Sequence, residues 1–575
     1  MLQDFIVVNM SEGFLLTNKI GGYTLLLEKP FSRYYGLFFF DDSKMFKTID
    51  YFDHKSSIKK TINHLWSVQR IFENGLIESF FMPDGHDALF YELNKDSEFD
   101  LILDCKNSYD NRSWGRNYEI SQELDCVIIH FSKTNDVRED SNDESEFDFY
   151  LAIFSEGFSF NKKNEWQEIN YEVDKKRNSQ PFSRWVYNAG SLKCKNAVFA
   201  FSKDKKKAIK TAKFVLNNKQ ILVKEKQDNI NGLAKNINAK KQIQDSYICA
   251  INSLNSLIVN NKGIFAGLPW FFQFWARDEA ISCKALMYNN LELAKDILFR
   301  NINNIDNSGK IKNNSYGNIY SADAIGWIFL RLESLYDRQK LSKKEIDLIK
   351  QKLELCIRKD LIYNEKNETW MDTYYNDNGR EGYRIEIQSL NLAMLRFYKK
   401  LVGKDFETDF KKKVINKFFK NELLLDGIND NTIRPNIFIA AYAYPELLTE
   451  KQWINCFDKV LPALWLQWGG LSSIDNNNLL FVNQHTGEDN KSYHRGDSWF
   501  WINNLTALVL YRFDKKKYKK YINKIIEASS YEILFSGATG HHAELSSAKE
   551  LRSEGCLAQA WSSAMFIELI EEIHR

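Results

Sequence analysis

The sequence has little of several features that would place it at once in a common functional class. Its 575 residues contain only 7 prolines, and 78 lysines and arginines almost balance 76 aspartates and glutamates, for a formal net charge of +2. Domains that bind nucleic acid usually carry a clear positive excess, so nucleic acid is not an expected partner. The scarcity of proline leaves room for long, uninterrupted helices.

Paired cysteines and long apolar runs are also missing. The eight cysteines show neither a CxxC pair nor another spacing typical of metal ligands, so we expect no zinc site and no disulfide framework. They are Cys105, Cys126, Cys194, Cys249, Cys283, Cys356, Cys456 and Cys556. No stretch reaches the roughly 18 apolar residues of a membrane span, and the start, MLQDFIVVNM, lacks the segments of a signal peptide. We expect a cytoplasmic protein with reduced cysteines and no membrane partner.

The chain is long enough for two large domains, and its pattern changes along its length. Residues 1–203 are expected to form a β-rich N-terminal domain, an antiparallel β-sandwich, because short β-branched and aromatic runs are bounded by turn residues. These runs include GYTLLLEKP, RYYGLFFFDD, FDLILDC, DCVIIHFS, FDFYLAIFS and NAVFAFS. Residues 134–146, TNDVREDSNDESE, are expected to be an exposed acidic loop.

Helical periodicity dominates the rest of the chain. Residues 204–245 predict a lysine-rich helical linker, and residues 246–575 predict an all-α domain. We expect helices at 245–260, 277–302, 321–338, 342–358, 385–401, 406–420, 436–447, 450–464, 497–512, 514–529 and 556–573. Their number and pairing are typical of a six-hairpin (α/α)6 barrel, although an open α-solenoid would show the same periodicity.

Aromatic residues are plentiful, at 14% with 14 tryptophans, and residues 267–280, GLPWFFQFWARDEA, concentrate them. Trp270 and Trp275 precede the adjacent charges of Arg277 and Asp278. One interpretation is a buried ion pair that fastens the start of a helix. The other is a pocket in which rings stack on a sugar while the charged pair binds its hydroxyls.

Four further polar clusters stand beside tryptophan or ahead of a small-residue helix. They are YSADAIGW with Asp323, TWMDTYYNDNGREGYRIEIQSL with Trp370, Asp372 and Glu386, SYHRGDSWFWINN with His494, Asp497 and Trp499, and GHHAELSSAKELRSEG with Glu544. A single Asp at a helix start is more often an N-cap than a catalyst. Five such clusters in helix-connecting positions favour a binding rim at one end of the helical domain.

Taken together, these motifs resemble a known family. GLPWFFQFWARDEA, TWMD, RIEIQSL, RPN at 434–436 and GCLAQAWSSA resemble the catalytic domain of glycogen debranching enzymes, the amylo-α-1,6-glucosidase family. LLTNKIGGYTLLLEKPFSRYYGLFF resembles the N-terminal domain of its short bacterial and archaeal members. The resemblance implies a β-rich domain followed by an (α/α)6 barrel that cleaves α-1,6-linked glucosyl stubs of glycogen or a related α-glucan, without metal or organic cofactor.

The resemblance also implies catalytic roles. Inverting glycosidases use an acid that protonates the leaving oxygen and a base that activates water on the opposite face, with carboxyls roughly 6.5–9.5 Å apart. By similarity, Asp372 is the general acid and Glu544 the general base. Glu550 and Glu554 remain alternative bases in the same segment.

Substrate-binding roles follow from the same resemblance. Arg277 and Asp278 would hold the hydroxyls of the terminal glucose, while Trp270 and Trp275 shape the pocket. The remaining expected substrate-binding residues are Asp323, Trp370, Glu386, Arg434, His494 and Trp499. Asp323 and Glu386 are also alternatives to Asp372 as the acid, and a structural role for Arg434 beside Pro435 fits equally well. The segment HRGDSWFW departs from the family's Gly-Thr/Ser-x-Trp-Pro pattern, and its extra carboxylate, Asp497, leaves substrate preference open.

Three rival functions stay open at this level. An exo-acting α-1,4-glucosidase or trehalase-like hydrolase would share the barrel, and a non-catalytic α-glucan-binding protein would share its rim. A helical-repeat scaffold would have no need of WARDEA or TWMD. The strand-rich part is too short for the (β/α)8 barrel of about 250 residues that a glucanotransferase domain would add, so chain shortening is expected from a different enzyme.

Overall fold

The computed structural model describes residues 7–9, 13–27, 31–123, 125–135, 146–233, 236–314, 317–376 and 379–574. Residues 136–145 of the predicted acidic loop lie outside this part. The chain forms two compact units. The first comprises Met1–Lys235, Asn255–Asn260 and Ile533–His541, and the second comprises Asn236–Leu254, Asn261–Glu532 and His542–Arg575. The domain limits expected at residues 203 and 245 stay a prediction.

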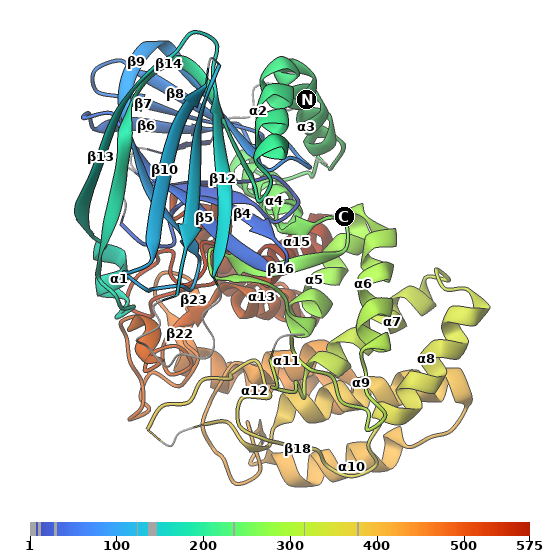
Figure 1. Ribbon diagram of the computed structural model, residues 1–575. Helices are drawn as coiled ribbons and strands as arrows, with labels where there is room; N and C mark the ends of the chain where they lie inside the picture. Colours follow the sequence, from blue (N-terminus) through green and yellow to red (C-terminus); the bar gives the residue numbers. More distant parts are fainter. Residues whose placement is uncertain are drawn as a thin grey trace. The chain divides into compact units, whose positions relative to one another are not determined.

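The first unit is built on one antiparallel sheet of fourteen strands (Figure 1). The strands are β1 (Val7–Asn9), β2 (Phe14–Thr17), β3 (Tyr23–Leu26), β4 (Gly36–Asp41), β5 (Lys44–Asp53), β6 (Ile58–Asn63), β7 (Val68–Phe72), β8 (Ile77–Phe81), β9 (Ala88–Asn107), β10 (Arg116–Glu123), β11 (Cys126–Lys133), β12 (Phe147–Phe154), β13 (Ser159–Asn170) and β14 (Ser183–Ser202).

Two 20-residue strands, β9 and β14, each take part in two layers of this sheet. One layer has the order β13-β14-β9-β5-β4-β3-β2, and the other has the order β1-β6-β7-β8-β9-β14-β12-β11-β10. The register of β14 against β9 shifts beside Gly190. Gly190 has φ +153°, and a Cβ there would lie 2.3 Å from the carbonyl oxygen of Asn161, so the close pairing with β13 requires glycine.

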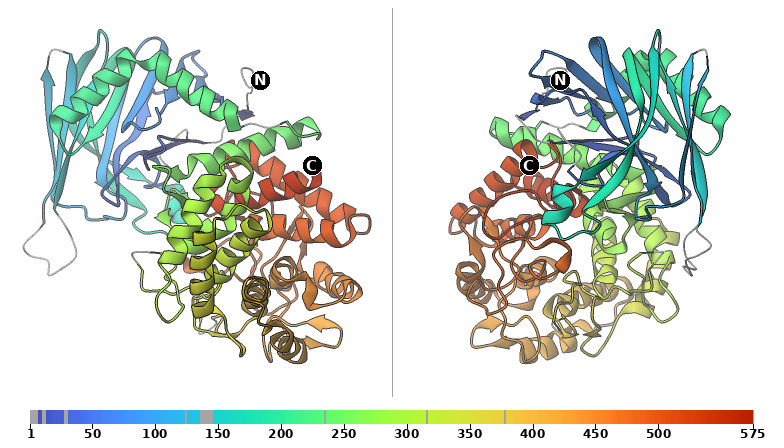
Figure 2. Two further views of the ribbon diagram at one scale, coloured as in Figure 1. Left: turned by 90° about the vertical axis from the view of Figure 1, so that its right-hand side faces the viewer. Right: turned by 60° about the vertical axis from the view of Figure 1, so that its left-hand side comes forward.

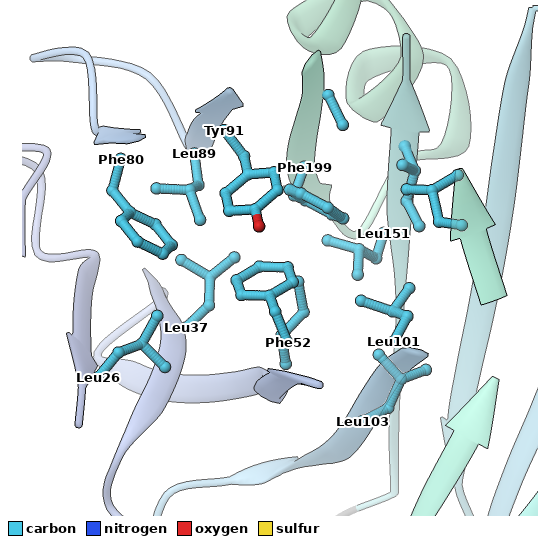
Figure 3. Close-up of a cluster of buried hydrophobic side chains, with 14 of the residues drawn as sticks. Leu26, Leu37, Phe52, Phe80, Leu89, Tyr91, Leu101, Leu103, Leu151 and Phe199 are labelled. Carbon is cyan, nitrogen blue, oxygen red and sulfur yellow. The ribbon is translucent and has the colours of Figure 1, made fainter. Parts of the chain in front are cut away.

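The two layers share one apolar core. Figure 3 shows Leu26 and Leu37 from the first layer facing Phe80 and Leu151 from the second, and all four are buried. Each large apolar side chain buried in this way stabilises the fold by about 1.5–3 kcal/mol. This arrangement confirms the predicted antiparallel β-sandwich.

Three helices accompany the sandwich: α1 (Glu172–Lys176), α2 (Lys205–Asn217) and α3 (Lys219–Leu233). The side chain of Asp204 caps α2 by accepting a hydrogen bond from the backbone N–H of Lys207 at 2.7 Å. Ala208, Ala212 and Val215 of α2 pack on a second buried cluster at the sheet. Within the predicted lysine-rich linker, residues 204–245, α2 and α3 belong to the first unit, and residues 236–245 with the start of α4 belong to the second.

The second unit is helical. Its helices are α4 (Lys241–Ser256), α5 (Ala276–Asn289), α6 (Leu291–Asn303), α7 (Ala324–Asp337), α8 (Lys343–Cys356), α9 (Ile385–Val402), α10 (Glu407–Phe418), α11 (Asn436–Ala443), η1 (Pro445–Leu447), α12 (Glu450–Leu464), η2 (Gly487–Asp489), α13 (Phe500–Asp514), α14 (Lys519–Phe535) and α15 (Ala560–His574).

Six of these helices form a closed ring. α5, α7, α9, α11, α13 and α15 each contact the next in this order, and α15 contacts α5. Figure 2 shows the closure, because the green start of this unit lies beside its red end. The helices α4, α6, α8, α10, α12 and α14 alternate with them along the chain. The ring confirms the predicted (α/α)6 barrel and excludes the open solenoid.

Burial separates the inner helices from the outer ones. All eight residues of α11 are buried. In α10 only Phe410, Val414 and Phe418 are buried, at a spacing of four residues. A helix with apolar residues on one face suits the outside of a barrel, and one buried all round suits its wall.

The prediction of a single helix over residues 277–302 was wrong. Residues 277–302 form two helices, α5 and α6, which meet at Asn290 with φ −144° and ψ 76°. The side chain of Asn290 accepts a hydrogen bond from the N–H of Leu293 at 3.2 Å and so starts α6. Asparagine is a good N-cap, and that signal could have revealed the break.

Short strands precede several inner helices and fix where they begin. They are β15 (Ile258–Val259), β16 (Gly263–Leu268), β17 (Phe271–Phe274), β18 (Tyr363–Asn364), β19 (Gly382–Tyr383), β20 (Phe419–Lys420), β21 (Leu423–Leu424), β22 (Trp465–Leu466), β23 (Gly470–Leu471), β24 (Ser498–Trp499), β25 (Leu545–Ser546) and β26 (Ala558–Gln559). β17 leads into α5, β24 into α13 and β26 into α15. Within the described ranges, every helix is too short or too polar to span a bilayer.

Candidate active site

The polar clusters predicted from sequence gather where the inner helices begin. Arg277 and Asp278 lie in the first turn of α5, and Asp323 occupies the N-cap position of α7. Glu386 lies in the first turn of α9, and Trp499 precedes α13. Helix N-termini carry a partial positive charge, which favours carboxylates at this rim.

Arg277 links two of these helices to the segment TWMD. Its Nε lies 2.8 and 2.9 Å from the two carboxylate oxygens of Asp323, and its Nη1 lies 3.3 Å from Oδ2 of Asp372. Arg277 and Asp323 are almost fully buried, at 2% and 1% exposure. Burial alone would lower the pKa of Arg277, but the two carboxylates outweigh it and hold this pKa above its usual value.

Asp323 stands at an N-cap position without capping. Its carboxylate makes no hydrogen bond to the backbone of α7. Instead the hydroxyl of Ser321 accepts a hydrogen bond from the N–H of Ala324 at 3.2 Å. The carboxylate of Asp323 is therefore committed to Arg277, and the buried ion pair expected around this motif joins Arg277 to Asp323.

Asp372 is the more accessible of the two carboxylates with a predicted catalytic role. Its side chain is 34% exposed, and its Oδ1 lies 3.6 Å from Nε2 of His494. Burial lowers the pKa of His494 to about 4, although Asp372 opposes this effect. His494 is therefore neutral near pH 7 and stacks on Trp499, with ring centroids 5.0 Å apart.

Asp278 points to a different set of partners. It is 5% exposed, and its Oδ1 accepts a hydrogen bond from Nε2 of Gln559 at 3.3 Å. Burial raises the pKa of Asp278 to about 8; Arg277 opposes the rise, and the charges of Glu544 and Asp372 add to it. Three carboxyl groups therefore interact at this rim, and Asp278 holds a proton at neutral pH.

Glu544 is buried at 2% exposure and is held by neutral donors. The Tyr493 hydroxyl donates to Oε1, and the backbone N–H of Cys556 donates to Oε2 at 3.0 Å. Burial, then Glu544 and then Asp372, raise the pKa of Tyr493 well above its usual value, so Tyr493 stays a donor. Gly555 has φ +68°, and a Cβ there would lie 2.1 Å from Oε2 of Glu544.

The two alternative bases have other surroundings. Oε1 of Glu550 lies 3.2 Å from Nη1 of Arg552, and its side chain is 57% exposed. Glu554 pairs with the same arginine. Glu544 alone of the three is held among the rim residues described above. Its catalytic role stays a prediction.

An aromatic wall adjoins Asp372. Trp370 is buried and meets His494, Trp499 and Trp501 edge to face, with centroids 5.4, 5.6 and 5.0 Å away. Nε1 of Trp499 donates to the carbonyl of Tyr493 at 2.8 Å, which ties the wall to the neighbour of Glu544. The wall thus fixes His494 and Tyr493 in their loop.

The other two predicted tryptophans lie just ahead of α5. Trp270 and Trp275 are half-buried. Trp275 occupies the N-cap position of α5 and meets Phe271 edge to face at 6.1 Å. Their part in substrate binding stays a prediction.

Glu386 and Arg434 are engaged with the protein itself. Both terminal guanidinium nitrogens of Arg380, Nη1 and Nη2, contact Glu386, and Nη2 also lies 2.8 Å from Asp426. Burial raises the pKa of Glu386, while Arg380 opposes the rise. Nη1 of Arg434 donates to the carbonyl of His494 at 2.8 Å, and burial lowers the pKa of Arg434 to about 10. These contacts give both residues a supporting part, and direct contact with substrate stays a prediction.

Two further side chains of the quoted motifs are also internal. Asp497 is buried and accepts hydrogen bonds from Nδ1 of His485 and Oγ of Ser492, each at 2.7 Å. Asp497 is therefore a loop support. His542, in the pair His541–His542, is bonded through Nδ1 to Glu532 at 2.6 Å.

Sequence reasoning missed Tyr493, Gly555 and Gln559. Gly555 carried a local signal, since glycine is the usual residue where φ is positive. Among the described residues, no group of three His, Cys, Asp or Glu side chains is placed to hold a metal ion. All eight cysteines are described, and each is buried with a free thiol.

Comparisons with known proteins complete the description. Among curated proteins, none matches the chain. One solved structure, of a glycosidase with a single glutamate replaced by alanine, has 10% identity and a TM-score of 0.41, over 58% of this chain and 98% of that one. The GH63 mannosylglycerate hydrolase from Thermus thermophilus in complex with Tris has 11% identity and a TM-score of 0.42, over 57% and 99% of the two chains. Residues 245–568, more than half of the chain, match the family model described as amylo-alpha-1,6-glucosidase. The chain belongs to the amylo-α-1,6-glucosidase family and is a glycoside hydrolase.

Proposed function

We propose that this protein is an inverting glycosidase that releases single α-1,6-linked glucosyl residues from the branch points of glycogen or a related α-glucan. The observation that carries the proposal is the pair of differently held carboxyls at one rim of the barrel. Asp372 is accessible and bordered by Arg277 and His494, whereas Glu544 is buried and bordered by Tyr493 and Cys556. One group to meet the leaving oxygen and another to meet water is what inversion needs.

In the proposed reaction Asp372 gives its proton to the glycosidic oxygen as the bond from that oxygen to C1 breaks. Glu544 takes a proton from a water molecule, whose oxygen forms a new bond to C1 from the opposite face. The products are β-glucose and a glucan with one branch fewer. Neutral donors suit the base, because they orient the carboxylate without cancelling its charge.

Arg277 and Asp278 would bind the glucose hydroxyls. Asp323 holds the guanidinium of Arg277 in one orientation, and the longer contact of Nη1 with Asp372, at 3.3 Å, leaves that nitrogen able to donate to a hydroxyl as well. Asp278, protonated at neutral pH, can donate a hydrogen bond as well as accept one. Rings of Trp270 and Trp275 would stack on the sugar.

The test is glucose release from a phosphorylase limit dextrin trimmed to single α-1,6 glucosyl stubs. Wild type should release β-glucose, followed by NMR, and Glu544→Gln should lose about 10²- to 10⁴-fold in kcat. The matched control is Glu550→Gln, which removes an exposed carboxylate paired with Arg552 and should retain wild-type rate.

Other outcomes separate the rival functions. Panose hydrolysis without maltotriose hydrolysis supports the α-1,6 assignment, and the reverse preference indicates an exo-acting α-1,4-glucosidase. Release of α-glucose contradicts inversion. Dextrin binding without any glucose release indicates a non-catalytic glucan-binding protein.

A further inference from the structure

A large concavity lies in the helical unit. It is a groove of about 1080 Å³ between the start of α4, the connection from α13 to α14, α14 itself, the end of α15 and the turn that holds Trp468. None of the predicted catalytic or substrate-binding residues lines it. Trp499 precedes α13 while Tyr511 lies near its other end, and 12 residues of helix separate positions by roughly 18 Å along the axis. The groove therefore extends away from Trp499 towards Tyr511, while Trp468 at its other end packs on Phe500, with ring centroids 6.4 Å apart.

Its charge is one-sided. Five lysines line the groove, against one glutamate, Glu527: Lys240, Lys515, Lys516, Lys519 and Lys524. In the described part of the chain no carboxylate forms an ion pair with any of the five, whereas the neighbouring Lys517, which does not line the groove, pairs with Asp458. Like charges on the walls of a concave site add their potentials and attract anions. The chain as a whole has a net charge of only +2, so this concentration is local.

Aromatic rings stand among these ammonium groups. Trp468, Tyr511 and Tyr531 line the groove, and Tyr531 is 50% exposed. Nε1 of Trp468 donates to the carbonyl of Ala548 at 3.2 Å, which fixes its ring. Nζ of Lys515 lies 5.4 Å from the ring centroid of Tyr511. Rings and cations together can bind a planar or sugar ring that carries negative charge.

We propose that this groove binds a phosphorylated ring compound, a nucleotide or a sugar phosphate. A neutral oligosaccharide would use the rings and leave five lysines without a role. A small inorganic anion would use the lysines and leave most of a groove of this size empty, since sites for small molecules commonly measure about 300–1000 Å³. The phosphate would lie among the lysines and the ring against tyrosine or tryptophan.

The experiment is calorimetric titration of the full chain with ATP, glucose 6-phosphate, inorganic phosphate and maltohexaose. ATP or glucose 6-phosphate should bind at least about tenfold more tightly than inorganic phosphate, because the ring adds contacts worth about 1.4 kcal/mol or more. If ATP binds more tightly, the ligand is a nucleotide; if glucose 6-phosphate binds more tightly, the ligand is a sugar phosphate. Raising NaCl from about 50 to about 200 mM should weaken this binding.

Variants locate the binding. Lys515→Gln/Lys519→Gln should weaken the phosphorylated probe at least about tenfold, because two charge-assisted contacts are lost. The matched control is Lys343→Gln/Lys344→Gln, the same change on two exposed lysines at the start of α8, and it should have no effect. Both double variants should release glucose at the wild-type rate.

The proposal is overturned if neither phosphorylated probe binds at about 10 mM, a concentration at which even weak sites fill. Equal affinity of wild type and Lys515→Gln/Lys519→Gln also overturns it. A Tyr531→Ala variant that loses affinity for maltohexaose but not for the phosphorylated probe would make the groove a glucan-binding surface instead. Because binding is read directly, these results do not depend on the proposed hydrolysis.

Discussion

The candidate active site holds its two proposed catalytic carboxyls, Asp372 and Glu544, with different kinds of partner. On the Asp372 side, a charged partner does so: Arg277, itself gripped by Asp323. On the Glu544 side, neutral donors do so, the hydroxyl of Tyr493 and the N–H of Cys556. A charged partner attracts the carboxyl over a longer range, whereas neutral donors fix a carboxylate by short hydrogen bonds without cancelling its charge.

The difference explains why Asp323 is needed. Arg277 makes its closest contacts, 2.8 and 2.9 Å, to Asp323 and a longer one, 3.3 Å, to Asp372. Asp323 therefore fixes the guanidinium of Arg277 more tightly than Asp372 does, and it sets the position from which Arg277 reaches Asp372.

The largest effect is expected when Asp323 is changed to Asn, which removes the charged partner of Arg277. Arg277 would then lose the partner of its two closest contacts, and its guanidinium would shift from its position beside Asp372. We expect kcat to fall about 100-fold or more and unfolding free energy to fall by about 3 kcal/mol, the scale for breaking a buried pair. Glucose-release kinetics and urea unfolding measure the two.

The control for this change is Asp458→Asn, which breaks the exposed ion pair with Lys517. Surface pairs contribute about 0–1 kcal/mol, so both readouts should stay near wild type. Full activity in Asp323→Asn would mean that the position of Arg277 does not depend on Asp323. It would contradict the claim that a charged pair holds Asp372 in place.

A smaller effect is expected from Gly555→Ala on the neutral side. The added Cβ would lie 2.1 Å from Oε2 of Glu544 and must displace it, at a residue with φ +68°. A shift of about 1 Å in a catalytic group can cost up to about 100-fold, so we expect kcat to fall between about ten- and a hundredfold with KM little changed.

Gly403→Ala is the matched control for Gly555→Ala. Gly403 also has positive φ, +80°, but a Cβ there meets nothing within 4 Å. Both variants should lose about 1 kcal/mol or more from backbone strain, measured by thermal unfolding, and only Gly555→Ala should lose activity. Equal activity in the two would show that Glu544 is not confined by Gly555.

Tyr493→Phe removes one of the neutral donors and should cost less, about tenfold in kcat, since a hydrogen bond to a charged group is worth about 1.5–3 kcal/mol and Cys556 remains. The carboxylate loses a donor that favours its charged form, so activity should also fall away at a higher pH on the acid side. Tyr518→Phe, which removes a phenol that donates to Asp458 at 2.9 Å, is the control and should leave the pH profile unchanged. An unchanged pH dependence of activity in Tyr493→Phe would mean that Tyr493 only packs beside Glu544 and does not act through its hydroxyl.

Much of the fold could be predicted from the sequence because it depends on local patterns. Short aromatic runs such as RYYGLFFFDD became β4, and the helical period of the second half became the barrel. The Trp-flanked clusters also marked the rim, because helix starts carry recognisable polar residues. The roles given to Asp372 and Glu544 came from the resemblance and stay predictions.

The pairing of site residues could not be predicted, because it is decided by closure of the ring. Arg277 sits next to Asp278 in sequence, yet its close partner is Asp323, 46 positions away. Asp278 instead meets Gln559, 281 positions away and just ahead of α15. Contacts of this kind exist only because α15 returns to α5, and no local pattern reports that.

The smallest expected effect on rate at low pH comes from Asp278→Asn. This variant tests the carboxyl that interacts with both Asp372 and Glu544. Burial raises the pKa of Asp278 to about 8, so the group is neutral below that pH, and the neutral amide of Asn should keep activity at pH 6 within about threefold of wild type. Wild-type kcat/KM should fall as pH rises through about 8, and this fall should be absent in the variant.

The stability of the folded state should depend on the same carboxyl group. The folded state keeps a proton that an unfolded aspartate loses above about pH 4, so wild type loses stability as pH rises towards 8 and the variant does not. Glucose release and melting temperatures across this range measure both, with Glu550→Gln as the control that behaves like wild type. A wild-type rate that stays level through pH 8 would mean that Asp278 is already ionised below that pH, so that its proton plays no part in binding the glucose hydroxyls.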